Sequence, residues 1–125
     1  MPDTALSESP FRLSAQPSET ELLAKYFRVL ADPSRLRILE ALEEHGELSV
    51  GELVENLDLP QPNVSNHLTC LRWCGFLSAR RDHRTIYNRI ADPRVTQLVG
   101  LARSLLADNA EHVAACRTLK AKTSR

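Results

Sequence analysis

The sequence is short of cysteine and of long apolar runs. It has three cysteines in 125 residues, an odd number that does not suit a disulfide framework, so we expect reduced thiols that are free to bind a metal or to react. No apolar run approaches the roughly 20 residues that a membrane helix needs. The first residues lack the basic start and the apolar block of a signal peptide, so we expect a cytoplasmic chain with no membrane partner.

Motifs for catalysis are also missing. No glycine-rich phosphate loop, paired-carboxylate site or nucleophile–base pair stands out, and the four histidines are not spaced like a metal cluster. We therefore expect no enzymatic activity. The length suits one domain with a modest core. We assign residues 1–17 to a flexible N-terminal arm, 18–116 to this domain and 117–125 to a basic C-terminal tail.

The formal net charge is zero, but the charges are unevenly distributed. Between Glu40 and Asp58 there are seven acidic residues and no lysine or arginine, whereas six arginines and two aspartates lie between Arg72 and Arg94. A neutral chain of this kind can present a strongly basic face to nucleic acid. A dipolar surface without a partner explains the charges equally well.

Capping residues and apolar spacing predict helices at residues 18–31, 32–46, 49–59 and 60–75. After Gly75 the apolar residues no longer follow a helical period, and residues 76–90 are typical of a β-hairpin with the polar tip RRDHRT. A second Asp-Pro start, at Asp92, predicts a long amphipathic helix. Its apolar stripe consists of Val95, Leu98, Ala102 and Leu105.

The helix predicted at residues 60–75 has an apolar side and a polar side without formal charge. A merely solvated side usually carries lysine and glutamate, whereas this one carries amide and hydroxyl groups, which can read base edges. Two short helices followed by an arginine-tipped hairpin describe a winged helix-turn-helix, which is mainly α with a β-hairpin wing. The candidate base contacts are Gln61, Asn63, Ser65, Asn66 and Thr69, and the candidate phosphate contacts are Arg80, Arg81 and Arg84, with His83 as a weaker one.

The segments LADPSRLRILEAL and LPQPNVSNHLTCLRWCGFLSARRDHRTIYNRIAD resemble the ArsR/SmtB family of bacterial metal-sensing repressors. The resemblance spans roughly residues 20–116. It implies a homodimer that binds double-stranded operator DNA, with the first and last helices at the dimer interface and release of the operator when the inducer binds. It also places His67 in the N-H-L of the DNA-binding helix, where we assign it no metal.

Cys70 and Cys74 lie one helical turn apart. In a helix, side chains at this spacing have β-carbons about 6 Å apart. This suits two thiolates on one soft ion, but not a disulfide, whose β-carbons are about 3.8 Å apart. Two small core residues explain the spacing equally well.

The resemblance favours a metal site. Some members of the family carry the pattern L-x-C-L-x-x-C-G in the recognition helix, and this sequence has LTCLRWCG. In a cadmium- and lead-sensing branch of the family, a cysteine from the C-terminal tail of the other subunit completes the site, which implies Cys116 here. Two other metal-binding patterns of the family are missing, because Arg94 stands in place of a histidine, and Ser49 and Gly51 stand in place of two thiols.

Three thiolates favour large soft ions such as Cd(II), Pb(II) or trivalent arsenic, whereas Zn(II) prefers a fourth ligand, for which His112 is an accessory candidate. We expect Arg72 to help keep the thiols deprotonated. The predicted function is therefore a repressor that is released when Cd(II) or Pb(II) binds Cys70, Cys74 and Cys116. The alternatives are an arsenite-responsive repressor with the same thiols, a redox or persulfide sensor in which Cys116 pairs with a recognition-helix thiol, and a winged-helix protein-interaction module.

Overall fold

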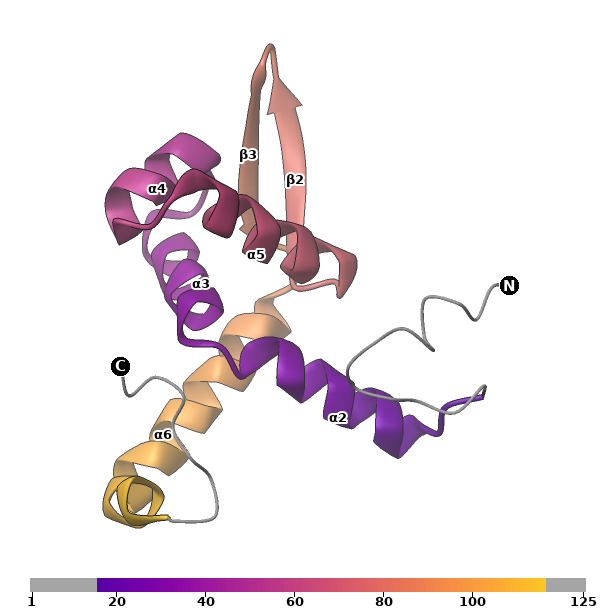
Figure 1. Cartoon of the computed structure of the whole chain (residues 1–125), viewed down its shortest axis with the longest axis vertical. Coiled ribbons are helices and arrows are strands. Elements are labelled where there is room, and N and C mark those ends of the chain that lie inside the picture. Colours follow the sequence, from indigo (N-terminus) through magenta and orange to yellow (C-terminus); the bar gives the residue numbers. More distant parts are fainter. Residues whose placement is uncertain (1–15, 117–125) are drawn as a thin grey trace.

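A computed structural model describes residues 16–116, which form helices and a small sheet whose β-hairpin projects from the helices (Figure 1). Apart from residues 16 and 17, the predicted N-terminal arm lies outside the described residues, as does the whole of the predicted basic tail. No helix in the described part is long and apolar enough to cross a membrane. In chain order the elements are α2 (Glu19–Leu30), α3 (Pro33–His45), β1 (Leu48–Ser49), α4 (Val50–Leu57), α5 (Gln61–Trp73), β2 (Leu77–Asp82), β3 (Thr85–Ile90) and α6 (Pro93–Ala115).

Short polar side chains begin four of the helices, as predicted. Before α2, the Ser18 hydroxyl accepts a hydrogen bond from the Glu21 backbone N–H at 3.1 Å, and the Glu21 carboxylate accepts one from the Ser18 N–H at 2.9 Å. Ser49 begins α4 with a capping box of the same kind. Asp32 and Asp92 begin α3 and α6 by accepting from backbone N–H groups of the first turn. These bonds satisfy N–H groups that have no partner inside the helix.

Glycine ends two of the helices at the predicted positions. Gly46, after α3, has φ 89°, and Gly75, after α5, has φ 85°. An L side chain rarely adopts these angles. The turn at Gly75 lets the Phe76 N–H donate to the Leu71 carbonyl at 2.9 Å. It thereby directs the chain from α5 into the sheet.

The core lies where α3, α4, α5 and the sheet meet. The predicted apolar side of α5 is fully buried, with Val64, Leu68 and Leu71 at most 1% exposed. Burying a side chain of this size stabilises the fold by roughly 1.5–3 kcal/mol. Phe76 is also fully buried, and its ring stacks on Tyr26 of α2 with ring centroids 4.4 Å apart. This aromatic pair attaches α2 to the rest of the domain.

The three strands form an antiparallel sheet in the order β1-β3-β2. The predicted hairpin is confirmed as β2 and β3, joined by His83 and Arg84. His83 has φ 61°, which lies in the left-handed region that tight hairpin loops use. The sequence did not indicate β1, because two residues are too few to show an alternating pattern.

The α2 helix and the far end of α6 reach away from the body of the domain (Figure 1) and expose apolar side chains. The predicted stripe of α6 buries Val95 near the start of the helix but leaves Leu105 exposed. Asn109, where φ is −125°, interrupts the helical backbone, and its Nδ2 donates to the Leu105 carbonyl at 2.9 Å. The uniform apolar period of the sequence gave no sign of this kink. The exposed apolar side chains are Leu22, Leu23 and Phe27 on α2 and Leu101, Leu105, Leu106 and Val113 on α6.

Candidate nucleic-acid interface and thiol site

The polar side of α5 faces away from the core. Gln61, Asn63 and Asn66 are exposed, whereas Ser65 and Thr69 are half-buried. The Thr69 hydroxyl donates to the Ser65 carbonyl at 3.0 Å, so its hydrogen is used within the helix. The three exposed amides can each donate and accept hydrogen bonds. We call them the recognition face, since paired donors and acceptors are what the major groove requires.

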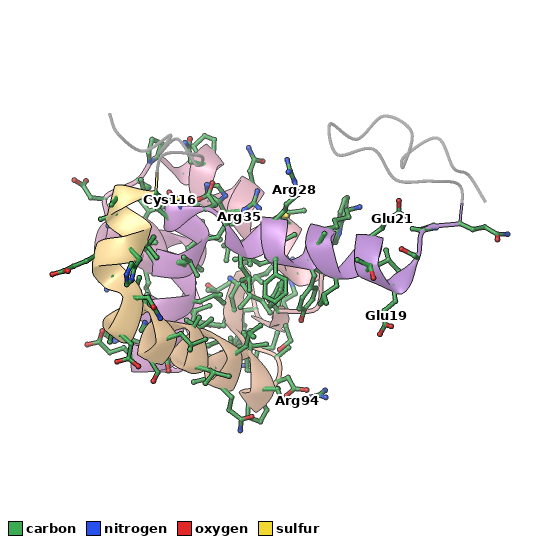
Figure 2. The ribbon with its side chains drawn as sticks, turned by 90° about the horizontal axis from the view of Figure 1, so that it is seen from below. Glu19, Glu21, Arg28, Arg35, Arg94 and Cys116 are labelled. Atoms are coloured by element: carbon green, nitrogen blue, oxygen red, sulfur yellow. The ribbon has the colours of Figure 1, made fainter. Side chains whose placement is uncertain are left out.

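His67 lies on the same helix but is turned towards the body of the domain. Its Nδ1 accepts a hydrogen bond from Arg35 Nε at 3.1 Å, and Arg35 Nη1 donates to the Val29 carbonyl at 3.0 Å. Figure 2 shows Arg35 close to the junction of α2 and α3. Because His67 is half-buried and bonded to Arg35, it holds α5 against that junction. The sequence resemblance placed His67 in the DNA-binding helix without indicating this contact.

The three arginines predicted to contact phosphates differ in their partners. Arg80 donates to both carboxylate oxygens of Glu47, at 2.8 and 2.9 Å, and lies over the Tyr87 ring, 4.9 Å from its centroid. The Arg80 guanidinium lowers the pKa of Glu47. Arg81 Nε donates to the His83 carbonyl in the hairpin loop at 3.1 Å. Arg84 is exposed in the loop itself, so Arg81 and Arg84 form the basic tip of the wing.

The wing is joined to α5 through a buried amide. Asn88, in the middle of β3, is the only polar residue that is buried among those described, at 0% exposure. Its Oδ1 accepts from Arg72 Nη1 at 3.2 Å, and its Nδ2 donates to the Leu48 carbonyl of β1 at 3.5 Å. Arg72 thus connects the C-terminal end of α5 to β3, and Asn88 continues the connection to β1.

Cys70 and Cys74 lie at the C-terminal end of α5, on adjacent turns of one side. The Cys74 N–H donates to the Cys70 carbonyl at 3.1 Å, which confirms the helical spacing. Both are free thiols, both are half-buried, and both pack against the core. The interpretation as core residues is therefore partly right. Each of the two residues is nevertheless only partly buried.

Burial raises the pKa of the Cys74 thiol above its ordinary value of 9.0, and the neighbouring Cys70 thiol raises it further. Lys25 and Arg35 lower it by a smaller amount. The expected help from Arg72 is wrong, because its guanidinium points to Asn88. The cations that act on the thiol come from α2 and α3 instead. A metal that binds Cys74 must displace its proton, so binding releases acid.

Cys116 follows the last residue of α6 and is exposed. Figure 2 shows Arg94 and Cys116 at opposite ends of that helix. Among residues 16–116, no group of three histidine, cysteine, aspartate or glutamate side chains is placed to hold a metal ion. A single chain, as described, does not bring the three predicted thiols together. His112 is exposed on the last turn of α6.

Sequence reasoning missed Asn88 and Glu47, which determine how the wing is held. The sequence held a weak signal for Asn88. In a strand, Asn88 shares a face with Ile86 and Ile90, so a polar residue at this position is unexpected. Glu47 had none, because it lies in an acidic run far from the wing in sequence. Together the fold and these faces define a winged helix-turn-helix DNA-binding domain.

The comparisons with known proteins agree with this class. The family described as "Bacterial regulatory protein, arsR family" matches residues 32–79. A probable mercury resistance operon repressor of Streptomyces lividans is 42% identical over 116 residues, which are 93% of this chain and 92% of the relative. The HTH-type transcriptional regulator CmtR of Mycobacterium tuberculosis is 44% identical over 78 residues, which are 62% of this chain and 65% of the relative. The crystal structure of M. tuberculosis Rv0081 matches with a TM-score of 0.72 and 38% identity, and covers 80% of this chain and 100% of that chain.

The chain therefore belongs to the ArsR/SmtB family of winged-helix transcriptional regulators. The resemblance seen in the sequence is confirmed, and so is the winged-helix fold.

Proposed function

We propose that the protein is a metal-responsive repressor, which binds operator DNA as a homodimer in the cytoplasm and releases it when a soft metal ion binds its thiolates. The observation that carries this proposal is the position of Cys70 and Cys74. They occupy the C-terminal end of the helix whose N-terminal part presents the recognition face. A ligand bound to the two thiols therefore acts directly on the helix that reads DNA.

On DNA, the recognition face enters the major groove, and Arg81 and Arg84 contact phosphates beside it. Ser65, His67 and Thr69, which the sequence also predicted as contacts, contribute less because they are half-buried. Arg80 contributes less because Glu47 already neutralises it.

The exposed apolar side chains of α2 and α6 support the homodimer. A single copy leaves Phe27 and Leu105 at least half exposed, and contiguous apolar patches of this kind usually mark an interface. A two-fold dimer through these helices presents two recognition faces, as operator half-sites one helical turn apart (about 34–36 Å) require.

For the metal site, we propose Cys70 and Cys74 of one subunit and Cys116 of the partner subunit as ligands. Two observations support this set. The pair on α5 is only partly buried and is not joined by a disulfide, and no third ligand lies beside it within residues 16–116 of the same chain. Cys116 follows a helix whose apolar side chains we place at the dimer interface.

The chemistry of three thiolates selects the inducer. Thiolates are soft ligands, so the site favours Cd(II) or Pb(II), with arsenite as the alternative that the same sulfur atoms accept. Zn(II) is disfavoured because it prefers a fourth ligand. Metal binding joins α5 of one subunit to Cys116 of the partner subunit, and this changes the relative position of the two recognition faces. Because operator spacing tolerates little such change, the metal favours release.

The test is operator binding with Cd(II), Pb(II), Zn(II) and arsenite, each compared with metal-free protein. We expect release by at least one soft ion, and we expect Cys70→Ser, Cys74→Ser and Cys116→Ser to abolish it while metal-free DNA binding stays nearly unchanged. If release follows oxidant or persulfide treatment and no soft ion causes it, the protein is instead a thiol redox sensor. If neither treatment changes DNA binding, the proposal is wrong.

A second candidate inducer is Hg(II), which two thiolates can bind in a linear arrangement. The neighbouring Cys70 and Cys74 thiols favour it, since they need no third ligand. The name of the Streptomyces lividans relative, a probable mercury resistance operon repressor, points the same way. The Cys116→Ser variant separates the two candidates. It keeps a response to Hg(II) if two thiols are sufficient, and it loses the response to Cd(II) if three are required.

A further inference from the structure

Asn88 is an unusual residue for the centre of a small sheet. Asparagine is disfavoured in strands, and a buried amide must find hydrogen-bond partners or destabilise the fold. An apolar residue would fill the same position without needing a partner. Asn88, at 0% exposure, instead accepts a hydrogen bond from Arg72 of α5 and donates one to the Leu48 carbonyl of β1. No buried side-chain nitrogen or oxygen atom among the described residues lacks a partner.

Arg72 lies in the helical turn that the two thiols delimit. Cys70 precedes it by two residues and Cys74 follows it by two, and the Cys74 N–H donates to the carbonyls of both Cys70 and Arg72. A ligand held by both sulfur atoms therefore spans the turn that carries Arg72. The guanidinium of Arg72 is fixed at its far end by the buried amide.

We propose that Arg72 and Asn88 are a positioning pair that sets the wing relative to α5 and transmits the state of the thiols to the wing. The transmission rests on the proposed function, whereas the positioning does not. In the metal-free protein the pair holds the wing tip beside the recognition face. A metal on Cys70 and Cys74 shifts Arg72, and through Asn88 it shifts β3 and the phosphate contacts of Arg84.

The variant that tests this pair must not leave a buried polar atom without a partner. Arg72→Met combined with Asn88→Leu removes both partners of this hydrogen bond and keeps the branched shape of the buried side chain, and replacing both partners by apolar groups of the same shape can be nearly neutral for stability. Arg72→Lys serves as the matched control, because it keeps a donor for Asn88. Thermal unfolding of each variant shows whether it folds.

The first measurement needs no metal. Arg84→Ala is introduced into the wild type and into the double variant, and the salt dependence of operator binding is measured for each. We expect Arg84→Ala to weaken binding several-fold in the wild type and in Arg72→Lys, but by less than about twofold in the double variant, whose wing is no longer held in place. An equal loss in all backgrounds would overturn the positioning role.

The second measurement compares operator affinity with and without the inducing metal. Couplings between two sites typically change affinity by about 5- to 150-fold. We expect the double variant to bind the metal, as its thiolate charge-transfer band reports, but to lose most of this change. A double variant that releases DNA as fully as the wild type would overturn the transmission. If the wild type shows the charge-transfer band but does not release the operator, the proposed function fails. The first measurement alone then decides whether the pair positions the wing.

Discussion

Arg80 and Glu47 form a two-point ion pair at the middle of the wing, with N–O distances of 2.8 and 2.9 Å. The planar guanidinium matches the carboxylate, and it lies over the Tyr87 ring. The acidic run of the chain therefore partly neutralises the basic hairpin at this point. The two charge clusters of the sequence do not form two independent faces, because Glu47 and Arg80 belong to opposite clusters and meet.

This pair predicts an unequal effect of the wing arginines on DNA binding. Arg84→Ala should weaken binding to all DNA sequences and reduce the slope of log affinity against log salt by about one unit, as expected for one lost phosphate contact. Arg80→Ala should change the slope much less, because its charge is already balanced by Glu47. Titrations of operator and unrelated DNA over a range of salt concentrations measure both slopes.

Glu47→Gln is the matched control for the wing. It removes the charge that holds Arg80 and keeps the shape of the side chain, so it should raise DNA affinity and steepen the salt dependence. Equal slopes for Arg80→Ala and Arg84→Ala would mean that Glu47 releases Arg80 when DNA binds. No effect of any wing variant on affinity or salt dependence would refute the docking described above.

The recognition face should control sequence preference rather than general affinity. Exchanging Asn63 or Asn66 for alanine should cost about 1–3 kcal/mol on the operator, the usual value of a good base contact, and far less on unrelated DNA. Thr69→Val tests the half-buried side, since its hydroxyl already bonds within the helix, and it should change little. Selection of preferred sites from a random DNA library would show the change. A loss that is equal on all sequences would place these amides at phosphates instead.

Local signals predicted most of the fold. The Ser18 capping box, the Asp-Pro helix starts and the buried side of α5 all depend on residues within a few positions of one another, so the sequence contains them directly. The kink at Asn109 depends on a local bond as well, but the apolar period continues through it and conceals it.

The candidate site could be predicted only in part. The exposed amides and arginines follow from helix and hairpin periodicity. The contacts that orient them do not: Arg35 and His67 are 32 residues apart, and Arg80 and Glu47 are 33 residues apart. Such pairs are determined by how the elements pack. The expectation for Arg72 failed for the same reason, because proximity to the thiols in sequence does not determine where a long side chain points.

The start of α6 should depend on pH in acid. Arg94 holds Asp92 by hydrogen bonds from its side chain and backbone, and these lower the pKa of Asp92 from 3.8 to about 2. A carboxylate with a lowered pKa stabilises the fold at pH values above 3.8, and this contribution is lost as the pH falls towards about 2. Asp92→Asn should therefore flatten the acid limb of a thermal-unfolding curve measured against pH. An unchanged acid limb would show that the pKa of Asp92 is the same in the folded and unfolded states.

The apolar side chains of α6 should hold the dimer together. Leu105→Glu places a charge among the exposed apolar residues, so we expect a monomer and the loss of cooperative binding to a two-half-site operator. Ala107→Glu adds the same charge two positions away, where the helix turns it to the opposite side. Sedimentation equilibrium distinguishes the two variants. A dimer that tolerates Leu105→Glu but not Ala107→Glu would place the interface on the other side of α6.

The last prediction concerns the metal ligands and uses a mixed dimer. One subunit carries Cys70→Ser and Cys74→Ser, and the other carries Cys116→Ser. If each site combines the α5 pair of one subunit with Cys116 of the partner subunit, the mixed dimer keeps one complete site, whereas each variant homodimer keeps none. We expect about half of the wild-type charge-transfer absorbance from the mixed dimer under saturating Cd(II), because one of two sites survives. The homodimers should give neither this band nor release of the operator by Cd(II). A Cys116→Ser homodimer that still forms the band and releases DNA on addition of Cd(II) would rule out a site shared between subunits, and the two thiols at the end of α5 would then be the whole metal site. A mixed dimer without the band would instead require all three thiols from the same subunit.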